Sequence, residues 1–340
     1  MDTGQGQAGW NYGLVQVHSG RGDGVSVTIN CNGKRIIVDF LPTSSLDGTV
    51  EGTLLARYEA AFLNEDDDEI DAAQQEIDDL IYTVGKPIFA RLAPPIATVG
   101  GQLGNLHSLL YPETMSFRFA TINGKAELLK QDCGSYLEQY YPPPPLQINN
   151  DLGLPKFSSN DIQVLEKIQG EGEITRVLVG GLERCCKTGE PFNWEAVARE
   201  TDCLWKIARS KHALSIRVPR LTGLVTSSDN GQTIGILEEY IPTDVKDLPT
   251  LRDVDTATID LSRRKKWAFQ IREMVHLMHE IGVVWGDGKP HNVLIHKDTD
   301  DAWLIDFGGG WTDGWVDENL RETREGDEQA TGRIAEFLGV

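Results

Sequence analysis

Apolar residues in the last third of the chain recur at the spacing of a buried helix, and two short apolar runs follow them. The helical positions are Trp267, Ile271, Met274, Val275, Met278 and Ile281. Steps of three and four residues place these side chains on one face, so the pattern predicts a helix that ends near Gly282. The apolar runs 293–295 and 302–305 flank a polar segment and predict two short strands joined by a turn.

Two Asn-Gly pairs in the N-terminal half predict β-hairpins. Residues 25–30 and 34–40 flank Asn32-Gly33. Residues 115–122 and 125–130 flank Asn123-Gly124 in the same way. Asn-Gly readily adopts the positive φ angles that a two-residue hairpin turn requires.

Helical sequence separates the two predicted hairpins, at about residues 51–63 and 66–92. The acidic residues 65–69 suit the N-terminus of the second helix, and Gly85-Lys86-Pro87 is expected to kink or end it. The acidic cluster is either a solvated helix face or a docking site for a basic protein partner. Nothing in residues 1–150 forms a constellation that carries chemistry.

A proline run divides the chain near its middle. Pro142 to Pro145 are consecutive prolines, and asparagine, glycine and serine are frequent in the residues that follow. Because proline continues neither a helix nor a central strand, residues 141–159 are predicted to form an extended linker. The chain of 340 residues is long enough for two domains. We therefore expect an α+β domain of unknown role at 1–140 and a second domain at 160–340.

The formal net charge of −20 argues against two classes of binding partner, nucleic acids and anionic membranes. General nucleic-acid binding requires a cationic face, and so does binding to an anionic membrane. We therefore expect neither nucleic-acid nor membrane binding. The five cysteines form no C-x-x-C pair, the N-terminal residues show no secretory leader, and no apolar run approaches the length of a membrane span. These features predict a cytoplasmic protein, with the nucleus as the alternative.

Four polar residues around the predicted strand pair carry the candidate chemistry. Asp287, Lys289 and Asn292 precede the first strand, and Asp306 follows the second, in an Asp-Phe-Gly sequence. Asp306 and Asn292 offer the hard oxygen ligands that Mg²⁺ prefers. Asp287 can accept or orient the proton of an attacking hydroxyl, and Lys289 can neutralise charge on a transferring phosphoryl group.

These segments resemble the catalytic loop and the metal-binding Asp-Phe-Gly motif of the protein-kinase-like superfamily. The resemblance covers residues 160–340, about half the chain. It implies an α+β, bilobal kinase-like fold, with a β-rich N-lobe at about 160–242 and a helical C-lobe at about 243–340. The chain looks most like compact fungal kinase-like proteins whose C-lobe ends soon after the Asp-Phe-Gly segment.

The resemblance also implies a nucleotide site for Mg-ATP in the N-lobe. Strands are expected at 164–168, 174–179 and 183–187, followed by a helix at 193–208 and by a strand and hinge at 235–242. The expected ATP-binding residues are Lys187 as the phosphate lysine, Glu200 as its partner, Gly170 and Gly172 of a glycine-rich turn, and Glu239 and Ile241 of the hinge. Asp327 resembles the kinase aspartate that braces the catalytic loop.

Four departures from the kinase pattern limit what the resemblance implies. Trp285-Gly286 replaces the usual His-Arg before the catalytic aspartate, and the turn at Gly170 has only two glycines with carboxylates beside them. Glu238 lies near the position at the back of the adenine pocket, which is normally apolar. Only about thirty residues follow the Asp-Phe-Gly, so the usual platform for peptide substrates is missing.

The sequence therefore predicts an ATP- and Mg²⁺-dependent phosphotransferase whose acceptor, a hydroxyl or another group on a protein or small molecule, is not defined. Two alternatives stay open: a pseudokinase scaffold that binds nucleotide or a partner without turnover, and adenylyl transfer from a kinase-like site.

Overall fold

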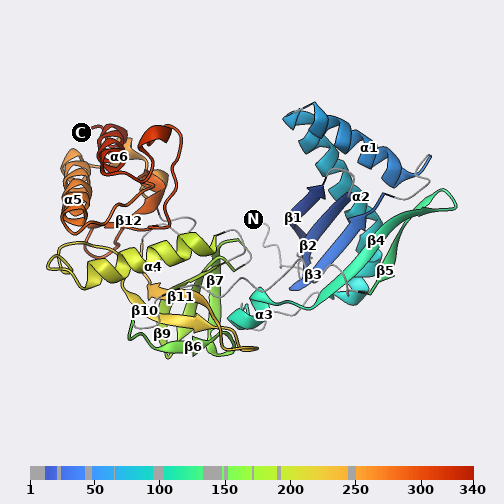
Figure 1. The fold of residues 1–340 in the computed structure, drawn as a ribbon, viewed down its shortest axis with the longest axis horizontal. Helices are drawn as coiled ribbons and strands as arrows, with labels where there is room; N and C mark the ends of the chain where they lie inside the picture. Colours follow the sequence, from blue (N-terminus) through green and yellow to red (C-terminus); the bar gives the residue numbers. More distant parts are fainter. Residues whose placement is uncertain are drawn as a thin grey trace, which may run out of the picture. The chain divides into compact units, whose positions relative to one another are not determined.

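The computed structural model describes residues 12–20, 24–42, 48–64, 66–94, 103–132, 148, 152–170, 172–189, 193–243 and 250–340. The chain forms two compact units, shown in Figure 1. The first is drawn from Met1–Gln102 and Ser108–Tyr140, and the second from Leu103–His107 and Tyr141–Val340. The predicted linker residues 141–147 and 149–151, together with Glu65, Cys133 and Glu171, lie outside the described residues.

The first unit is built on a five-stranded sheet of order β1-β2-β3-β4-β5. Its strands are β1 (Tyr12–Gly20), β2 (Gly24–Cys31), β3 (Lys34–Phe40), β4 (Thr114–Ile122) and β5 (Lys125–Gln131). β3 and β4 are parallel, and the other neighbours are antiparallel. Both Asn-Gly pairs form the hairpin turns, with positive φ at Asn32 and Asn123. The sequence reasoning did not predict β1.

Two helices cover one face of this sheet (Figure 1). They are α1 (Val50–Leu63), capped by the Thr49 hydroxyl, and α2 (Asp67–Leu92), capped by the Asp66 carboxylate. α2 runs through Pro87 to Leu92, the end that the sequence predicted, so the alternative that Gly85-Lys86-Pro87 ends the helix is wrong. Apolar residues of both helices, including Leu54 and Ile77, pack against sheet residues such as Phe117 in one core.

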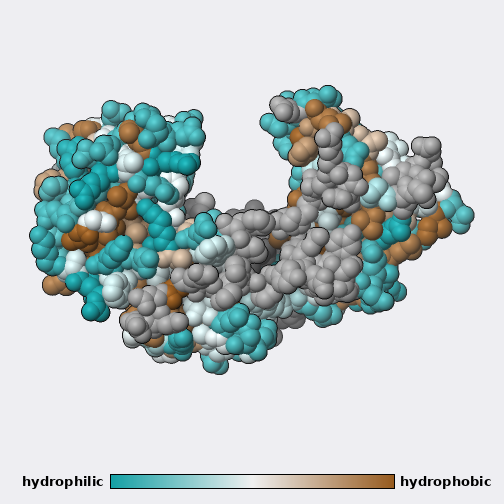
Figure 2. Space-filling model, viewed as in Figure 1, coloured by the Kyte–Doolittle hydropathy of each residue, from teal (hydrophilic) through white to brown (hydrophobic). Residues whose placement is uncertain are grey.

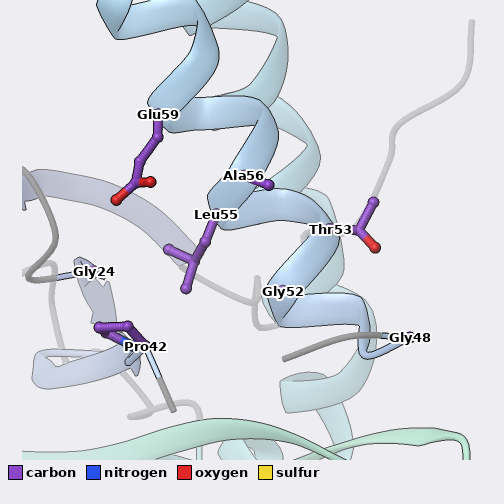
Figure 3. A pocket seen from close by; sticks show the side chains of 8 residues that line it. All are labelled: Gly24, Pro42, Gly48, Gly52, Thr53, Leu55, Ala56 and Glu59. Atoms are coloured by element: carbon purple, nitrogen blue, oxygen red, sulfur yellow. The ribbon is translucent and has the colours of Figure 1, made fainter. Parts of the chain in front are cut away.

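A hollow of about 390 Å³ lies between the first turns of α1 and the first residue of β2 in the first unit (Figure 3). Its lining is mostly glycine and apolar: Gly24, Pro42, Gly48, Gly52, Thr53, Leu55, Ala56 and Glu59. Among the described residues of that lining, Glu59 is the single ionisable one.

The second unit begins with a six-stranded sheet of order β6-β10-β11-β9-β8-β7. The strands are β6 (Lys156–Ser158), β7 (Gln163–Gln169), β8 (Ile174–Val179), β9 (Leu182–Thr188), β10 (Leu221–Thr226) and β11 (Thr233–Glu239). β6 falls inside the segment predicted as linker and pairs in parallel with β10. Helix α4 (Trp194–Ala208) follows β9, as expected for a kinase N-lobe. The short helix α3 (Leu106–Leu110) lies where the chain passes from the second unit back to the first.

The rest of the second unit is mainly helical. Helix α5 (Leu261–Glu280) precedes the hairpin of β12 (Val293–Ile295) and β13 (Ala302–Leu304), and α6 (Arg324–Phe337) comes last. Short 3₁₀ turns occur at Ser159–Asp161, Leu251–Asp253, Thr256–Thr258, Pro290–Asn292 and Glu318–Leu320. Apolar faces of α5 and α6 pack with the hairpin around the buried residues Trp267, Trp285 and Phe307. The molecule is thus α+β, and its second unit has the bilobal protein-kinase-like fold.

The visible surface is predominantly hydrophilic, with apolar side chains in small separate patches (Figure 2). Among the described residues, no helix is long and apolar enough to cross a membrane.

Candidate active site

The loop after α5 is held from below by one buried carboxylate. Asp327 of α6 is 1% exposed and accepts hydrogen bonds from the backbone N–H groups of Trp285 and Gly286, at 2.8 and 2.9 Å. His279 Nε2 lies 2.8 Å from the same carboxylate. A buried carboxylate that receives several hydrogen bonds is well compensated for its desolvation. Asp327 therefore braces the loop, as the resemblance implied, and His279 is one of the groups that hold the Asp327 carboxylate in place.

Arg199 of α4 fixes the same loop from the opposite lobe. Its guanidinium donates to the carbonyl oxygens of Val284, Trp285 and Phe307. Gly286 has φ +97°, and a Cβ built there would lie 2.8 Å from Arg199 Nη2. The guanidinium therefore fills the volume that a side chain at position 286 would need. This explains why glycine precedes Asp287, a departure that the sequence alone left without a reason.

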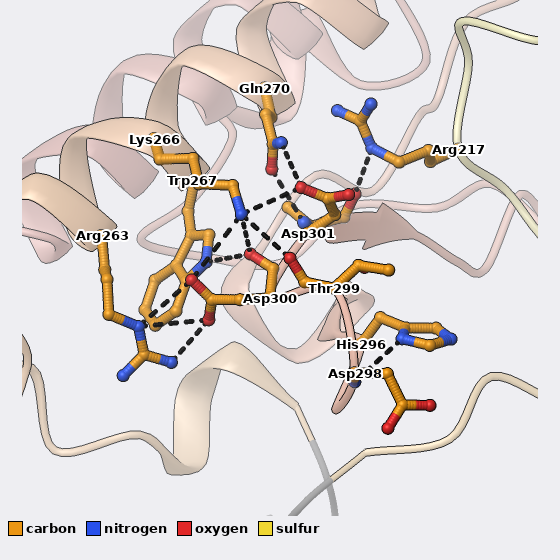
Figure 4. Close-up of polar contacts among 11 residues, drawn as sticks. Arg217, Arg263, Lys266, Trp267, Gln270, His296, Asp298, Thr299, Asp300 and Asp301 are labelled. Carbon is orange, nitrogen blue, oxygen red and sulfur yellow. Dashed lines mark hydrogen bonds and ion pairs between the residues drawn. The ribbon is translucent and has the colours of Figure 1, made fainter.

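The turn between β12 and β13 is fastened to α5 by a network of polar contacts (Figure 4). Lys266 Nζ and Trp267 Nε1 both donate to the carbonyl oxygen of Asp300, and Arg263 pairs with the Asp300 carboxylate. Gln270 donates to Asp301 at 2.7 Å and accepts the N–H of Ala302 at 2.9 Å. Such a network fixes the hairpin as a rigid support for the residues at its other end.

Asn292 and Asp306 lie at that other end of the hairpin. The N–H of Ile305 donates to the carbonyl oxygen of Asn292 at 3.0 Å, which brings the two chain segments together. Asn292 Nδ2 donates to the carbonyl oxygen of Asp287 at 2.8 Å, so its amide oxygen faces elsewhere. Asp306 has φ +62°, a strained conformation for a residue with a side chain. Among the described residues, the one hydrogen bond to its Oδ1 is a long one, 3.3 Å, from Gly308 N.

These two residues offer one carboxylate and one amide oxygen, a donor set that fits Mg²⁺. Among the described residues, no group of three or more His, Cys, Asp or Glu side chains could hold a metal ion by itself. Two protein oxygens suit a magnesium site, because Mg²⁺ keeps its remaining positions for water and phosphate oxygens.

Asp287 and Lys289 form a close pair with a third partner, Thr312. Lys289 Nζ lies 2.5 Å from Asp287 Oδ2, and the Thr312 hydroxyl donates to Asp287 Oδ1 at 2.8 Å. Lys289 Nζ also donates to Thr312 Oγ1 at 2.8 Å. Both carboxylate oxygens of Asp287 therefore accept a hydrogen bond, one from Lys289 and one from Thr312. Sequence reasoning did not single out Thr312, although its place six residues after Asp306, in a glycine-rich segment, was a signal.

Lys187 of β9 lies between two carboxylates in the N-lobe. Its Nζ is 2.5 Å from Glu200 Oε1 of α4 and 3.8 Å from Glu238 Oε2 of β11. Burial alone would lower the pKa of Lys187, but the two carboxylates outweigh that effect and raise it above its ordinary value. Glu200 Oε1 also accepts the N–H of Phe307 at 3.2 Å, which links this pair to the Asp-Phe-Gly segment.

Glu238 is the least compensated of these groups. It is 1% exposed, and its Oε1 has no hydrogen-bond partner among the residues that the structure describes. Burial raises the pKa of Glu238 to about 8, against the opposing attraction of Lys187. One ammonium group cannot neutralise Glu200 and Glu238 together in a dry site. With a pKa of about 8, Glu238 is mainly the neutral acid near pH 7.

The turn between β7 and β8 contains Gly170 and Gly172, both with positive φ. A Cβ at Gly170 would lie 2.7 Å from the Glu173 carboxyl carbon, so this side chain lies directly against the turn. The Thr188 hydroxyl donates to the Gly172 carbonyl oxygen at 2.9 Å and ties the turn to β9.

The hinge after β11 begins at Glu239. Its N–H donates to the carbonyl oxygen of Arg220 at 2.9 Å, so a contact with adenine from this residue would have to use its carbonyl. Ile241 is 5% exposed, and the next carbonyl, that of Pro242, accepts the N–H of Lys297. The hinge is thus anchored to the C-lobe.

Residues 215–310 match the RIO domain, an atypical protein-kinase-like family. The match contains Glu238, Asp287, Lys289, Asn292 and Asp306, and it ends before Thr312. A comparison with curated proteins found no match. The second unit is therefore protein-kinase-like, a class that binds ATP and transfers phosphoryl groups.

Proposed function

We propose that the protein transfers the γ-phosphate of Mg-ATP to an acceptor through the site around Asp287. The observation that carries this proposal is that hydrogen bonds join the segments of three residues at one end of the hairpin: Asn292 Nδ2 donates to the carbonyl oxygen of Asp287, and the N–H of Ile305, the neighbour of Asp306, donates to the carbonyl oxygen of Asn292. A buried polar group is costly unless it is hydrogen-bonded or bound to a ligand, and the least satisfied of these side chains is Asp306, whose one side-chain hydrogen bond among the described residues is the 3.3 Å contact from Gly308 N.

Asn292 and Asp306 are the residues that would hold the magnesium ion, which neutralises phosphate charge when it is bound. Lys187 contributes a second positive charge at the nucleotide phosphates, and Glu200 holds its ammonium in place. A neutral Glu238 leaves Lys187 with one ionised partner, which preserves its capacity to attract phosphate. Gly170 and Gly172 would cover the phosphates, with Glu239 and Ile241 at the adenine.

Asp287 receives the proton of the acceptor during transfer, and Lys289 neutralises charge that develops beside it. The Thr312 hydroxyl bond shows that Asp287 Oδ1 can accept from an aliphatic hydroxyl at 2.8 Å. A nucleotide-binding scaffold is the second candidate, because the buried acid Glu238 is unusual in an adenine pocket.

Two variants test the proposal. Asp306→Ala should lose the rise in melting temperature that Mg-ATP gives the wild type, since binding stabilises only a protein that retains the site. Asp287→Asn should keep that rise and lose turnover by about 10²- to 10⁴-fold. Asp313→Ala removes an exposed carboxylate nearby and is the matched control.

The products separate the candidates. ADP supports phosphoryl transfer, AMP indicates adenylyl transfer, and stabilisation by ATP with neither product indicates a scaffold. Equal stabilisation of the wild type and Asp306→Ala by Mg-ATP would contradict the assigned metal site.

A further inference from the structure

The sheet face that contains Lys187 is polar between that lysine and the hinge. Residues that are paired across two strands direct their side chains to the same face, and so do alternate residues of one strand. Cys185 lies two residues before Lys187 on β9, and it is paired with Arg176 of β8 on one side and with Glu238 of β11 on the other. Arg176, Cys185 and Glu238 therefore form one row across this face, next to the row of Lys187.

The guanidinium of Arg176 is held by a ring and two carboxylates. Its Cζ lies over the ring of Tyr240, 4.8 Å from the ring centroid. Its Nη2 and Nε donate to Glu183 Oε2 at 2.7 and 3.1 Å, and its Nη1 lies 3.5 Å from Glu166 Oε2. A group that is already fixed loses little freedom when a ligand binds to it. The Arg176 side chain is still 31% exposed, so part of it is open to a ligand.

The two ends of the proposed nucleotide site place the base near this guanidinium. Lys187 and Asp306 lie at the phosphates, and the base lies at residues 239–241 of the hinge, of which Tyr240 is the middle one. The base then has to lie against the part of the sheet that separates Lys187 from the hinge, which is the row of Arg176. That row offers an arginine, a cysteine and a carboxylic acid rather than aliphatic side chains. A planar guanidinium stacks well on an aromatic ring system.

We propose that Arg176 is a base-binding residue of this site and that its guanidinium stacks on the nucleobase, an inference that rests on the function proposed above. The ligand class is a nucleoside triphosphate with a purine base, because the two fused rings cover more of the guanidinium than a pyrimidine does. Stacking uses the face of a base and not the groups at its edge. Arg176 therefore contributes affinity for purines without selecting adenine over guanine.

The neighbouring carboxylates set what Arg176 contributes to binding. Glu183 and Glu166 balance its positive charge locally, whereas Lys187 is the cation at the phosphates. The contribution of Arg176 is therefore the plane of the guanidinium rather than a general attraction for anions. A lysine at position 176 keeps the charge and lacks the plane.

The test is calorimetric titration of wild type and Arg176→Lys with Mg-ATP and, separately, with inorganic triphosphate in the presence of Mg²⁺. We expect ATP to bind the variant about five- to tenfold more weakly, and inorganic triphosphate to bind both proteins equally. Arg184→Lys is the matched control. Arg184 precedes Cys185 on β9, so its side chain lies on the opposite face, where it stacks on Phe157 at 5.5 Å. This control should bind ATP as the wild type does.

The outcomes separate this inference from the proposed function. Unchanged ATP affinity in Arg176→Lys overturns the role of Arg176 and leaves nucleotide binding intact. An equal loss of affinity for ATP and for inorganic triphosphate also overturns it, because the effect is then one of charge or of folding. If neither probe binds the wild type, the proposed function and this inference fail together.

A second comparison uses the size of the base. The loss of affinity caused by Arg176→Lys should be similar for ATP and GTP and smaller for CTP, in the order of the ring area that each base offers for stacking. A loss for CTP as large as that for ATP would show that the guanidinium contacts another part of the nucleotide, and it would overturn the inference.

Discussion

The second unit contains two lysine–carboxylate pairs with the same 2.5 Å separation in very different surroundings. Lys187 and Glu200 have side chains only 10% and 4% exposed, with the further carboxylate Glu238 beside them. Lys289 and Asp287 are 20% and 9% exposed and share a threonine hydroxyl. The Lys187–Glu200 pair is nearly inaccessible to solvent and contacts other buried groups. The Lys289–Asp287 pair is more exposed, and its third partner is the Thr312 hydroxyl. The two pairs therefore differ in burial and in their third partner rather than in distance, a difference that fits the separate roles proposed for them above.

The largest expected effect comes from breaking the sealed pair. Lys187→Met leaves the buried Glu200 without its cation and should lower the free energy of unfolding by about 3–5 kcal/mol. Urea denaturation measures the change. The control Lys211→Met removes a lysine that is 70% exposed and pairs with Glu280, and it should cost less than about 1 kcal/mol. Similar losses in the two variants would show that the Lys187 pair is not desolvated in solution.

A smaller loss of stability is expected for Arg199, which connects the two pairs: it lies next to Glu200 on α4, and its guanidinium binds the loop before Asp287. Arg199→Ala would leave the carbonyl oxygens of Val284, Trp285 and Phe307 without the guanidinium and should cost about 2–3 kcal/mol. Arg209→Ala, at the exposed end of the same helix, is the control; it removes a contact with the Trp205 ring and should cost at most about 1 kcal/mol. Calorimetric melting would compare them, and equal effects would mean that Arg199 does not join the lobes.

The smallest expected effect on stability concerns Glu238, the carboxylate beside the Lys187–Glu200 pair, and it depends on pH. The pKa of Glu238 is raised to about 8 in the folded chain, so folding favours its protonated form. Its contribution to stability is fully present below the pKa of the unfolded chain and is lost as the pH rises through about 8. The charges that face it are Lys187, Glu200 and Asp306.

Glu238→Gln should therefore flatten the fall in melting temperature between pH 5 and pH 9. At pH 9 the variant should be more stable than wild type by roughly 1–2 kcal/mol, because it carries no buried charge. The two proteins should be closest at pH 5. A wild type and a variant with the same pH dependence would show that Glu238 is ionised throughout the range.

Local sequence patterns predicted the helix and the hairpin that position the candidate site, and two turns of the first unit. The apolar spacing before Gly282 gave α5, the runs 293–295 and 302–305 gave the hairpin, and the Asn-Gly pairs gave two turns of the first unit. These features depend on neighbours in sequence, where the periods of helix and strand are visible. β1 lacked such a signal because its glycine and polar residues resemble those of a loop.

Contacts between distant segments were not visible in the same way. Arg199 is 86 residues from Trp285, and Thr312 is 25 residues from Asp287. Which side chain enters a given volume depends on how the lobes and the segment after Asp-Phe-Gly fold together. The sequence indicated that the glycine at 286 was unusual, but only the coordinates show which side chain fills the space beside it.

Position 286 and position 199 compete for one volume. A variant with any larger residue at 286 has to displace the guanidinium, and a shorter residue at 199 leaves an empty space beside the glycine. A shorter residue at 199 would relieve the clash alone: the backbone strain of φ +97° at position 286 and the loss of the guanidinium bonds to three carbonyl oxygens would both remain. The loop before Asp287 therefore constrains both positions at once, and a double substitution should be no better tolerated than the single ones.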